Sequence, residues 1–364
     1  MTFNKDLFIK VSRLRNHSNE FIKETVDYAN NLLEKDLPVI FSLKHFSLLA
    51  NVDYDELVKI INIRSSLYKF YQIKKKNGKG FRQIVVPYNN LRCIQDYIKT
   101  EILDKVQIHD NATGFVKGKS IYDNAKKHSN QQEILNIDLF KFFDSITERR
   151  IYGIFKSLGY AKNLALDFAK LTTVALPEEY LSSFKFDERR LYDEIVRKGE
   201  CVLPQGAPTS PILSNLITRR LDLRMSSLAD KLKVNYSRYA DDLTFSGNYG
   251  TVPTFTLLDK IINDEGFRIN WSKAKISKKG RLQMVTGLTV SNDIHVHRKF
   301  KKEVKKHIYG CLNFGVNNHL AHIQKDDIGY YKEWLAGKIY FIYSVEPDYA
   351  KKLLDDYNKI IWPL

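Results

Sequence analysis

The sequence predicts an α+β protein, in which helical stretches are combined with short β-hairpins. Helical spacing of apolar residues runs through residues 19–63 and returns at residues 330–361. Two hairpin patterns lie between them, at residues 68–86 and 234–245, and residues 134–137 form a short apolar run typical of a buried strand. Because the chain of 364 residues has no repeat and no flexible linker, we expect one compact molecule with interleaved lobes.

The first two elements are defined by cap and turn signals. Asp53 is placed to cap the last helix of the stretch 19–63. The hairpin at 68–86 is expected because Asn77-Gly78 is a strong turn signal between two strands. Lys74 and Arg82 lie on the two arms of this basic hairpin, where they could grip a phosphate. The alternative is an ordinary solvated turn, since turns are often rich in lysine.

The composition favours a negatively charged partner. The chain has 58 Lys and Arg against 42 Asp and Glu, a formal net charge of +16. Such a field attracts nucleic acid, although it can serve solubility alone. Residues 1–20 hold no apolar run of the length that a signal peptide or membrane span needs, so we expect a cytoplasmic protein without a membrane partner. Three widely spaced cysteines, Cys93, Cys201 and Cys311, indicate buried reduced side chains rather than a zinc knuckle or disulfides.

Three aspartates stand where strand ends could bring them together. Asp138 follows the apolar strand at 134–137, and Asp241 and Asp242 occupy the bend of the hairpin at 234–245. Phosphoryl transfer needs carboxylates that hold two divalent cations roughly 3.5–4 Å apart, and magnesium suits an all-oxygen site. Each aspartate alone is commonly a solvated turn residue. Their joint occurrence favours a metal-dependent polymerase site.

Three ordered motifs carry a family resemblance. Residues Tyr239-Ala240-Asp241-Asp242 resemble the hairpin box of reverse transcriptases. Residues 135–146, Leu-Asn-Ile-Asp-Leu-Phe-Lys-Phe-Phe-Asp-Ser-Ile, resemble the first catalytic motif of the same enzymes. Residues 203–211, Leu-Pro-Gln-Gly-Ala-Pro-Thr-Ser-Pro, resemble the loop that lies against template and incoming nucleotide. The resemblance implies an RNA-directed DNA polymerase.

The same resemblance implies a right-hand polymerase fold. Its palm would be an antiparallel sheet backed by helices, with the three aspartates at one edge. The expected division places the fingers, with the N-terminal helical region, at residues 1–130 and 147–204, the catalytic palm at 131–146 and 205–290, and the thumb at 291–364.

The resemblance also implies a role for each site residue. Asp138, Asp241 and Asp242 would be the catalytic carboxylates and, with the Leu139 carbonyl, the ligands of two Mg²⁺ ions, for which Mn²⁺ can substitute. Phe143 would place a ring under the nucleotide sugar and exclude a 2′-hydroxyl, which selects dNTPs; the alternative is a core aromatic. The remaining nucleotide contacts would be Lys74, Arg82, Gln205, Gly206 and Lys273, with Lys275 as a close alternative to Lys273 beside the pyrophosphate.

Two shorter elements resemble signatures of bacterial retron enzymes. Residues 124–128, Asn-Ala-Lys-Lys-His, fit an Asn-Ala-x-x-His signature, and Val285-Thr286-Gly287 fits a Val-Thr-Gly signature. Asn124, His128 and the second signature would bind RNA, whereas a structural alternative makes His128 a helix-end residue and Gly287 a turn glycine. A basic helix follows and is expected to contact an RNA stem-loop; its cationic residues are Arg298, Lys299, Lys301, Lys302, Lys305, Lys306 and His307.

A retron enzyme would bind a cognate noncoding RNA as template and primer. The resemblance implies priming from the 2′-hydroxyl of an internal guanosine, a branched RNA–DNA product, and anti-phage defence with an effector protein encoded nearby. One alternative is a group II intron-like or other defence reverse transcriptase, which would typically bring further domains. Another is an RNA-binding scaffold without activity, which the intact aspartates disfavour. An RNA-dependent RNA polymerase is disfavoured by Phe143. Residues 175–200 resemble an insertion with no assigned role.

Overall fold

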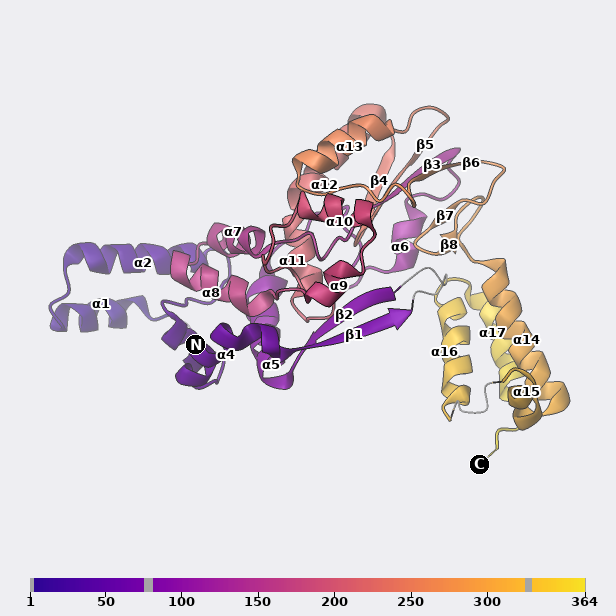
Figure 1. The fold of residues 1–364 in the computed structure, drawn as a ribbon, viewed down its shortest axis with the longest axis horizontal. Helices are drawn as coiled ribbons and strands as arrows, with labels where there is room; N and C mark the ends of the chain where they lie inside the picture. Colours follow the sequence, from indigo (N-terminus) through magenta and orange to yellow (C-terminus); the bar gives the residue numbers. More distant parts are fainter. Residues whose placement is uncertain (1–2, 75–80, 325–328, 364) are drawn as a thin grey trace. The chain divides into compact units, whose positions relative to one another are not determined.

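The computed structural model describes residues 3–74, 81–324 and 329–363 (Figure 1). The chain forms two compact units, the first from residues 1–117, 138–227 and 254–272 and the second from residues 118–137, 228–253 and 273–364. Each unit is assembled from separate segments, as expected for a chain without a linker. These bounds differ from those expected for fingers, palm and thumb, so that division stays a prediction.

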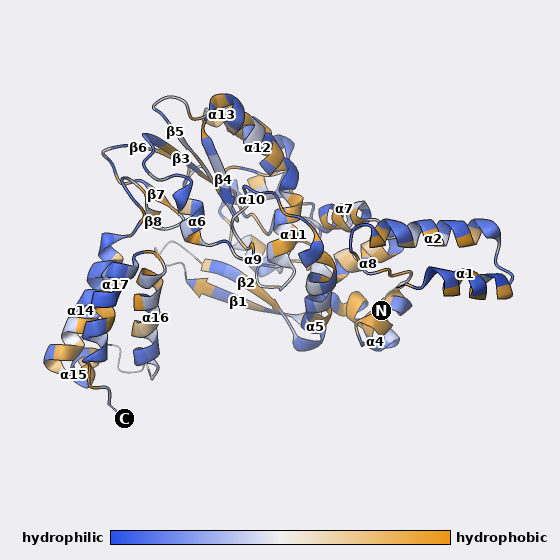
Figure 2. Cartoon of the chain, turned by 180° about the vertical axis from the view of Figure 1, so that it is seen from behind, coloured by the Kyte–Doolittle hydropathy of each residue, from blue (hydrophilic) through white to orange (hydrophobic). Residues whose placement is uncertain are grey.

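The first unit is mainly helical. Figure 2 shows hydrophilic and hydrophobic residues alternating along its N-terminal helices, as amphipathic helices require. The α-helices are α1 (Lys5–Leu14), α2 (Asn19–Leu33), α3 (Leu43–Leu49), α4 (Tyr54–Ile63), α5 (Asn89–Tyr97), α7 (Glu148–Leu158), α8 (Lys162–Thr172), α9 (Glu178–Ser182), α10 (Phe186–Asp193), α11 (Ser210–Ile217) and α13 (Phe255–Asp264). Short 3-10 helices η1 (Arg64–Leu67) and η3 (Leu103–Lys105) and a short π-helix η2 (Ile98–Ile102) accompany them. Helix α12 (Arg219–Leu232) runs from the first unit into the second.

Capping and aromatic packing explain the helices of the first unit. The Asp53 carboxylate accepts hydrogen bonds from the backbone N–H groups of Asp55 (2.9 Å) and Glu56 (3.1 Å), so the predicted cap of α4 is confirmed. In the core, the ring of Phe168 on α8 lies 4.9 Å from that of Phe46 on α3 and 5.2 Å from that of Phe155 on α7. These rings hold α3, α7 and α8 together.

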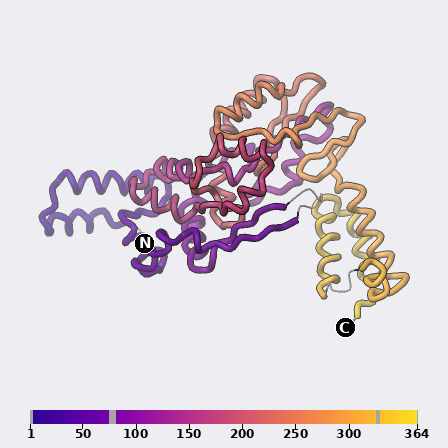
Figure 3. The backbone as a smooth tube through the Cα atoms, in the orientation of Figure 1, coloured from indigo at the N-terminus to yellow at the C-terminus, as the bar shows by residue number. Residues whose placement is uncertain are grey.

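The predicted hairpin at 68–86 forms an antiparallel ribbon. Strand β1 (Tyr68–Lys74) pairs with β2 (Phe81–Pro87), with Lys74 opposite Phe81 at the far end. Figure 3 shows the two strands running side by side. The turn itself, including Asn77-Gly78, lies outside the described residues.

The second unit contains a four-stranded sheet, a small sheet and the C-terminal helices. The strand order is β4-β5-β3-β6 in the larger sheet and β7-β8-β9 in the smaller one. The elements are α6 (Ile121–Lys126), β3 (Glu133–Asp138), β4 (Asn235–Tyr239), β5 (Asp242–Gly247), β6 (Lys275–Lys278), β7 (Met284–Val285), β8 (Leu288–Thr289), β9 (His295–Val296), α14 (Arg298–Phe314), α15 (Val316–His322), α16 (Tyr331–Tyr343) and α17 (Pro347–Asn358). The predicted buried strand is therefore present as β3, and the predicted hairpin at 234–245 is present as β4 and β5; it is called the catalytic hairpin here because it carries Asp241 and Asp242, for which a catalytic role is expected.

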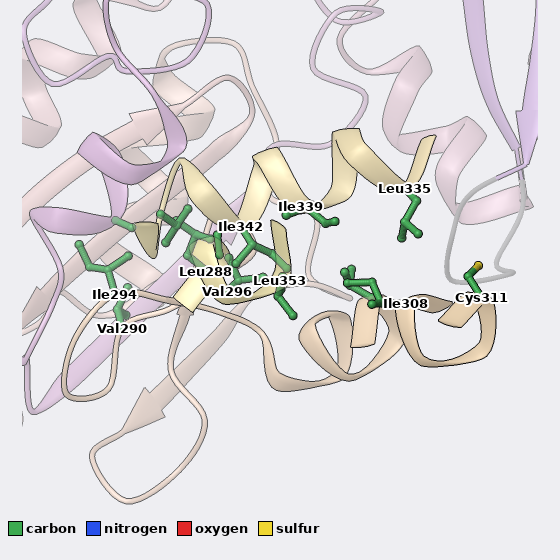
Figure 4. Close-up of a cluster of buried hydrophobic side chains, with 14 of the residues drawn as sticks. Leu288, Val290, Ile294, Val296, Ile308, Cys311, Leu335, Ile339, Ile342 and Leu353 are labelled. Atoms are coloured by element: carbon green, nitrogen blue, oxygen red, sulfur yellow. The ribbon is translucent and has the colours of Figure 1, made fainter. Parts of the chain in front are cut away.

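One apolar core joins the small sheet to the C-terminal helices (Figure 4). Leu288 on β8, Ile308 on α14, Ile339 on α16 and Leu353 on α17 all belong to it. Burial of such side chains contributes about 1.5–3 kcal/mol each. The small sheet is thus fixed to the helix bundle rather than standing alone.

Two smaller findings complete the fold. Throughout the parts of the chain that the structure describes, no helix combines the length and apolar character needed to cross a membrane. The expectation of three buried cysteines is wrong for Cys93, which is exposed, and Cys201 is only partly covered. Cys93 is not among the buried residues of α5, which are Leu91, Ile94 and Gln95.

Candidate active site

Strands β3 and β5 are neighbours in the four-stranded sheet and run antiparallel. Gln132, directly before β3, donates its backbone N–H to the Gly247 carbonyl at the end of β5 (3.1 Å). Further along, the Thr244 hydroxyl of β5 donates to the Asn136 side-chain oxygen of β3 (3.2 Å). Residue numbers fall on one strand as they rise on the other, which is the antiparallel order. The end of β3 and the start of β5 therefore share one edge of the sheet.

The predicted carboxylates stand at this edge. Asp138 is the last residue of β3, and Asp242 is the first residue of β5. Tyr239 pairs with Asp242, which leaves Ala240 and Asp241 as a two-residue loop between β4 and β5. Asp138 is buried, Asp241 is partly exposed and Asp242 is exposed. The sheet therefore presents carboxylates with different access to solvent.

The loop of this catalytic hairpin has a strained backbone, and a buried arginine side chain bonds to it. Ala240 has a φ of 56°, a left-handed conformation that costs a non-glycine residue about 1–2 kcal/mol. Arg238, which is fully buried, donates from Nη1 to the Ala240 carbonyl oxygen at 3.0 Å. A buried guanidinium is expensive to desolvate unless its donors are used. Arg238 thus holds the loop that carries Asp241.

Asp138 is oriented by a residue that the sequence did not single out. Its Oδ1 accepts a hydrogen bond from Asn270 Nδ2 at 2.8 Å, and its backbone carbonyl accepts one from the Asn270 N–H at 2.8 Å. Both contacts come from one residue, so the Asp138 backbone and side chain are held together. Next to it, Leu139 forms an isolated antiparallel bridge with Ile269.

The donor set fits a divalent cation shared with substrate. Among the described residues, no group of three or more His, Cys, Asp and Glu side chains could hold a metal ion unaided. Magnesium in nucleotide-handling enzymes typically takes one or two carboxylates and completes its shell with waters and substrate phosphates. Strand-end carboxylates at a sheet edge supply oxygen donors of that kind.

Phe143 lies within a row of aromatic rings. Its partly exposed ring is 5.4 Å from Phe142 and 6.1 Å from Phe115. Phe142 continues inward to the buried ring of Phe267 at 5.7 Å. Phe115 is 46% exposed and has a φ of 63°, which is unusual for a bulky residue. Phe143 is therefore packed against other rings on part of its surface and remains partly exposed.

The predicted nucleotide loop lies directly on strand β2. The Val85 N–H donates to the Gln205 carbonyl at 2.8 Å. Gly206 has a φ of 138°, and a Cβ there would come within 2.9 Å of the Val85 carbonyl oxygen. Only glycine fits this approach. Arg82 is exposed on the same strand, so β2 carries both the loop contact and a cation.

The lysines expected near pyrophosphate are both exposed. Lys275 begins β6, where it pairs with Asn136 of β3, and Lys273 precedes the strand. Lys74 is exposed at the end of β1. The choice between Lys273 and Lys275 stays open.

His128 is part of the protein interior, which corrects the expectation of direct RNA contact. Its ring is fully buried, with Nδ1 2.7 Å from the Ser246 hydroxyl and Nε2 2.7 Å from the Ser237 hydroxyl. Burial, with a smaller effect of Lys127, lowers the pKa of His128 to about 3. Asn124 is also buried, at 1% exposure. Since Ser237 is on β4 and Ser246 on β5, the neutral His128 ring ties both strands of the catalytic hairpin together.

The segment Val285-Thr286-Gly287 is mainly a turn. Val285 is buried in the core of the second unit, so the expected contact of its side chain with RNA is wrong. Thr286 and Gly287 form the loop between β7 and β8, with φ values of 47° and 82°. Positive φ at both loop positions is the requirement of a type I′ hairpin turn, which favours Gly at the second. Thr286 also donates its hydroxyl to the Ile121 carbonyl of α6 at 3.1 Å.

Comparison with known proteins decides the family. Residues 73–307 match the family model described as reverse transcriptase (RNA-dependent DNA polymerase). The chain is 31% identical over 346 residues to the Retron Ec86 reverse transcriptase of Escherichia coli, covering 93% of this chain and 95% of that protein. The chain belongs to the retron reverse transcriptases. It is an RNA-directed DNA polymerase, of a family that generally uses divalent metal ions.

Other relatives agree with this assignment. The reverse transcriptase is 33% identical over 315 residues to the Retron Ec83 reverse transcriptase of Escherichia coli, covering 85% of this chain and 92% of the relative. It is 34% identical over 236 residues to the Retron Mx162 reverse transcriptase of Myxococcus xanthus, covering 62% of this chain and 47% of the relative. These matches span much more of the chain than the catalytic motifs alone.

Helix α14 of this retron reverse transcriptase offers a basic face that is smaller than expected. Lys301 lies 2.9 Å from Glu346 in an ion pair, and His307 is buried against His319 and Tyr331. Both are therefore removed from the predicted cationic surface. The exposed cations of the helix are Arg298, Lys299, Lys302, Lys305 and Lys306.

Three supporting residues of the reverse transcriptase were missed from the sequence. They are Asn270, Arg238 and Phe115, which contact Asp138, the hairpin loop and Phe143. Only Arg238 gave a usable signal, since it directly precedes the motif Tyr239-Ala240-Asp241-Asp242. Asn270 and Asp138 are 132 positions apart, so no local pattern relates them.

Proposed function

We propose that this reverse transcriptase copies part of a cognate structured noncoding RNA into single-stranded DNA, starting from the 2′-hydroxyl of an internal guanosine and giving a branched RNA–DNA product. The observation that carries the proposal is the bonding of the retron signature to the polymerase strands. His128 bonds to Ser237 and Ser246 on both strands of the catalytic hairpin. The second signature joins the same unit through Thr286 and Ile121.

This arrangement suits coupling between RNA binding and catalysis. Helix α6 ends two residues before His128, which is bonded to both strands of the hairpin that carries Asp241 and Asp242. A displacement of α6 would therefore be passed through His128 to this hairpin. The exposed turn at Gly287 is bonded to the start of α6 through Thr286. RNA bound at that turn could therefore influence the active-site strands through two hydrogen-bonded steps.

Four groups would hold two Mg²⁺ ions, for which Mn²⁺ can substitute: the carboxylates of Asp138, Asp241 and Asp242 and the Leu139 carbonyl. When bound, the cations stabilise the attacking and leaving oxygens of the transfer. Asn270 keeps Asp138 Oδ1 oriented by donating from its amide. Arg238 holds the Asp241 loop. These residues prepare the site before substrate arrives, which limits reorganisation during the reaction.

The nucleotide would be selected by shape and held by cations. Phe143 excludes a 2′-hydroxyl, and the backbone at Gln205 and Gly206 approaches the base pair closely because residue 206 has no side chain. Arg82 and Lys74 hold the triphosphate. Lys273 or Lys275 compensates the charge of the departing pyrophosphate; both are exposed, Lys273 just before β6 and Lys275 at its start.

The proposed subdomains are those of a right-hand polymerase fold. Fingers comprise residues 1–130 and 147–204, palm 131–146 and 205–290, and thumb 291–364. The RNA duplex would be contacted by Gly287 and by the exposed cations Arg298, Lys302 and Lys305 of α14. Asn124, His128 and Val285 would act from the interior, by holding that surface in shape. Recognition by shape and 2′-hydroxyls suits a folded RNA, whose grooves expose little sequence.

We include the cellular role in the proposal. A cytoplasmic reverse transcriptase of this kind would act in anti-phage defence together with an effector protein encoded nearby and the RNA–DNA product. The family relationship supports this role.

The test is co-expression of the protein with its upstream intergenic region. We expect a small abundant DNA that RNase shortens, that a debranching enzyme separates from RNA, and that Asp241→Asn abolishes. The matched control is Asp348→Asn, which removes the charge of a carboxylate whose side chain is 96% exposed on α17. It should leave the product unchanged.

Two outcomes would contradict the proposal in different ways. DNA synthesis on an added primer-template without any branched species would indicate a reverse transcriptase of another class, such as a group II intron-like enzyme. Absence of both products would indicate an RNA-binding scaffold.

A further inference from the structure

The insertion at residues 175–200, here called the capping segment, packs on the turn that follows Asp138. Residues 139–147 form this turn, here called the gate turn because Phe143 lies within it. Val174 and Val202 bridge each other at the base of the capping segment, and Val202 also bridges Thr147 at the end of the gate turn. The insertion is thus closed at its base and attached to the gate turn.

The capping segment builds its own small core on the gate turn. Phe140 of the gate turn belongs to a buried cluster with Phe184, Tyr192, Val196 and Val202. Within it, the rings of Phe184 and Tyr192 lie 5.5 Å apart, nearly perpendicular, a favourable aromatic geometry. This apolar cluster is the first connection between the capping segment and the gate turn.

Polar contacts add a second connection, which passes through Tyr180. Its hydroxyl donates to Asp144 Oδ2 at 2.8 Å, and Lys141 Nζ donates to the same hydroxyl oxygen at 3.3 Å. Lys141 Nζ also lies 3.7 Å from the centroid of the Phe184 ring, a cation–π contact. Tyr180 therefore bonds the residues on both sides of Phe143, two positions before it and one after it.

The gate turn needs such support. Lys141 has a φ of 44°, a left-handed conformation that is costly for a side chain with a Cβ. Asp144 is 8% exposed, and burial raises the pKa of its carboxyl group while Lys141 and Tyr180 act in the opposite direction. A strained backbone and a buried carboxyl group persist only where neighbours hold them.

We propose that the capping segment positions Phe143 through Tyr180, and so sets how strictly the enzyme discriminates between dNTPs and rNTPs. Tyr180 is a positioning residue in this account, since it contacts the gate turn and not the substrate. The inference rests on the proposed function, in which Phe143 excludes the 2′-hydroxyl. It gives the insertion a role that its charged sequence did not suggest.

The experiment compares Tyr180→Phe with Tyr192→Phe in the purified full-length protein. Both changes remove one hydroxyl from the same cluster, but within the described chain the Tyr192 hydroxyl forms no hydrogen bond to the gate turn. Single-nucleotide insertion on a primed RNA template gives kcat and KM for a dNTP and the matching rNTP. We expect Tyr180→Phe to reduce the preference for dNTP about tenfold, the size of effect of one buried hydrogen bond, while kcat for dNTP changes little.

Further variants separate the possible failures. Asp144→Asn keeps an oxygen that accepts from Tyr180 and should retain the preference, whereas Asp144→Leu should lose it. Equal preference in wild type, Tyr180→Phe and Tyr192→Phe would overturn the inference. If Phe143→Ala kept the full preference for dNTP over rNTP, the inference would also be overturned, because Phe143 would then not exclude the 2′-hydroxyl. Lack of DNA synthesis by the wild type would instead contradict the polymerase assignment itself.

Discussion

Two hairpins in the second unit have loops of the same length but of different sequence and different support. Both β4–β5 and β7–β8 are closed by two-residue loops, Ala240-Asp241 in the first and Thr286-Gly287 in the second. The β7–β8 loop places Gly287 at one of its positive-φ positions, where glycine has no steric penalty. At the first loop position both hairpins hold a non-glycine residue with positive φ, Thr286 in one and Ala240 in the other, and the β4–β5 loop is supported there by Arg238.

The difference shows where the molecule tolerates strain. The β7–β8 turn has glycine at its second position, and the strained residue at its first position, Thr286, is bonded through its hydroxyl to the Ile121 carbonyl. The catalytic hairpin is strained at its tip and is supported by Arg238 and by His128. Backbone strain that surrounding residues maintain is typical of active sites, where it helps to hold catalytic groups in a fixed position.

The largest effect is expected from Arg238→Met. It removes the buried donor to Ala240 and should lower the free energy of unfolding by about 3 kcal/mol. DNA synthesis, measured well below the melting temperature, should fall further than the folded fraction does. Arg281→Met, at an exposed arginine of the same unit, is the control. If both variants lowered stability and DNA synthesis equally, Arg238 would not give the catalytic hairpin any special support.

The second effect is a dependence of stability on pH through His128. Burial lowers the pKa of His128 to about 3, whereas the unfolded chain titrates near 6.5. Between these values the unfolded state binds more protons, so stability falls as the pH drops below about 6.5, by at most about 1.4 kcal/mol per pH unit. Urea unfolding at pH 7 and pH 5.5 measures this. His128→Gln should be less stable at pH 7 and lose most of that slope; an unchanged slope would assign the effect to other groups.

A smaller effect is expected at the β7–β8 turn. Thr286→Val keeps the shape and the backbone strain but removes the hydroxyl that bonds to Ile121, so stability should fall by about 1 kcal/mol. Thr286→Ser keeps the hydroxyl and should lose less. Denaturant melts of the pair measure the contribution of the bond, and equal values would mean that the turn geometry alone explains the signature.

The smallest effect is expected from Ala240→Gly. Relief of the left-handed strain exceeds the entropic cost of glycine by about 1 kcal/mol or less, so the melting temperature should rise slightly. The freer loop should orient Asp241 less well and reduce kcat modestly. A variant that is both more stable and fully active would show that the strain has no catalytic use.

The fold was predictable where signals are local. Apolar strand patterns identified β3 and the catalytic hairpin, a run of basic residues identified α14, and the motif aspartates fell at strand ends as expected. Burial of His128 was not predictable from its short signature, because that depends on Ser237 and Ser246 more than a hundred positions away. Ser246, which follows Leu243 and Phe245 in an alternating strand pattern, was the available signal for a polar partner inside. The role of Asn270 had no such signal.

The strand order has a consequence during synthesis. β3 lies between β5 and β6, yet these partners follow it by about a hundred residues or more. At about 5–20 residues per second, a ribosome needs on the order of ten seconds to supply them. During that time the apolar strand β3 is present on the nascent chain without either of its partner strands. Its unpaired edges make such a chain prone to aggregation. Chaperone supply and translation speed, rather than final stability, are thus expected to limit the yield of active enzyme.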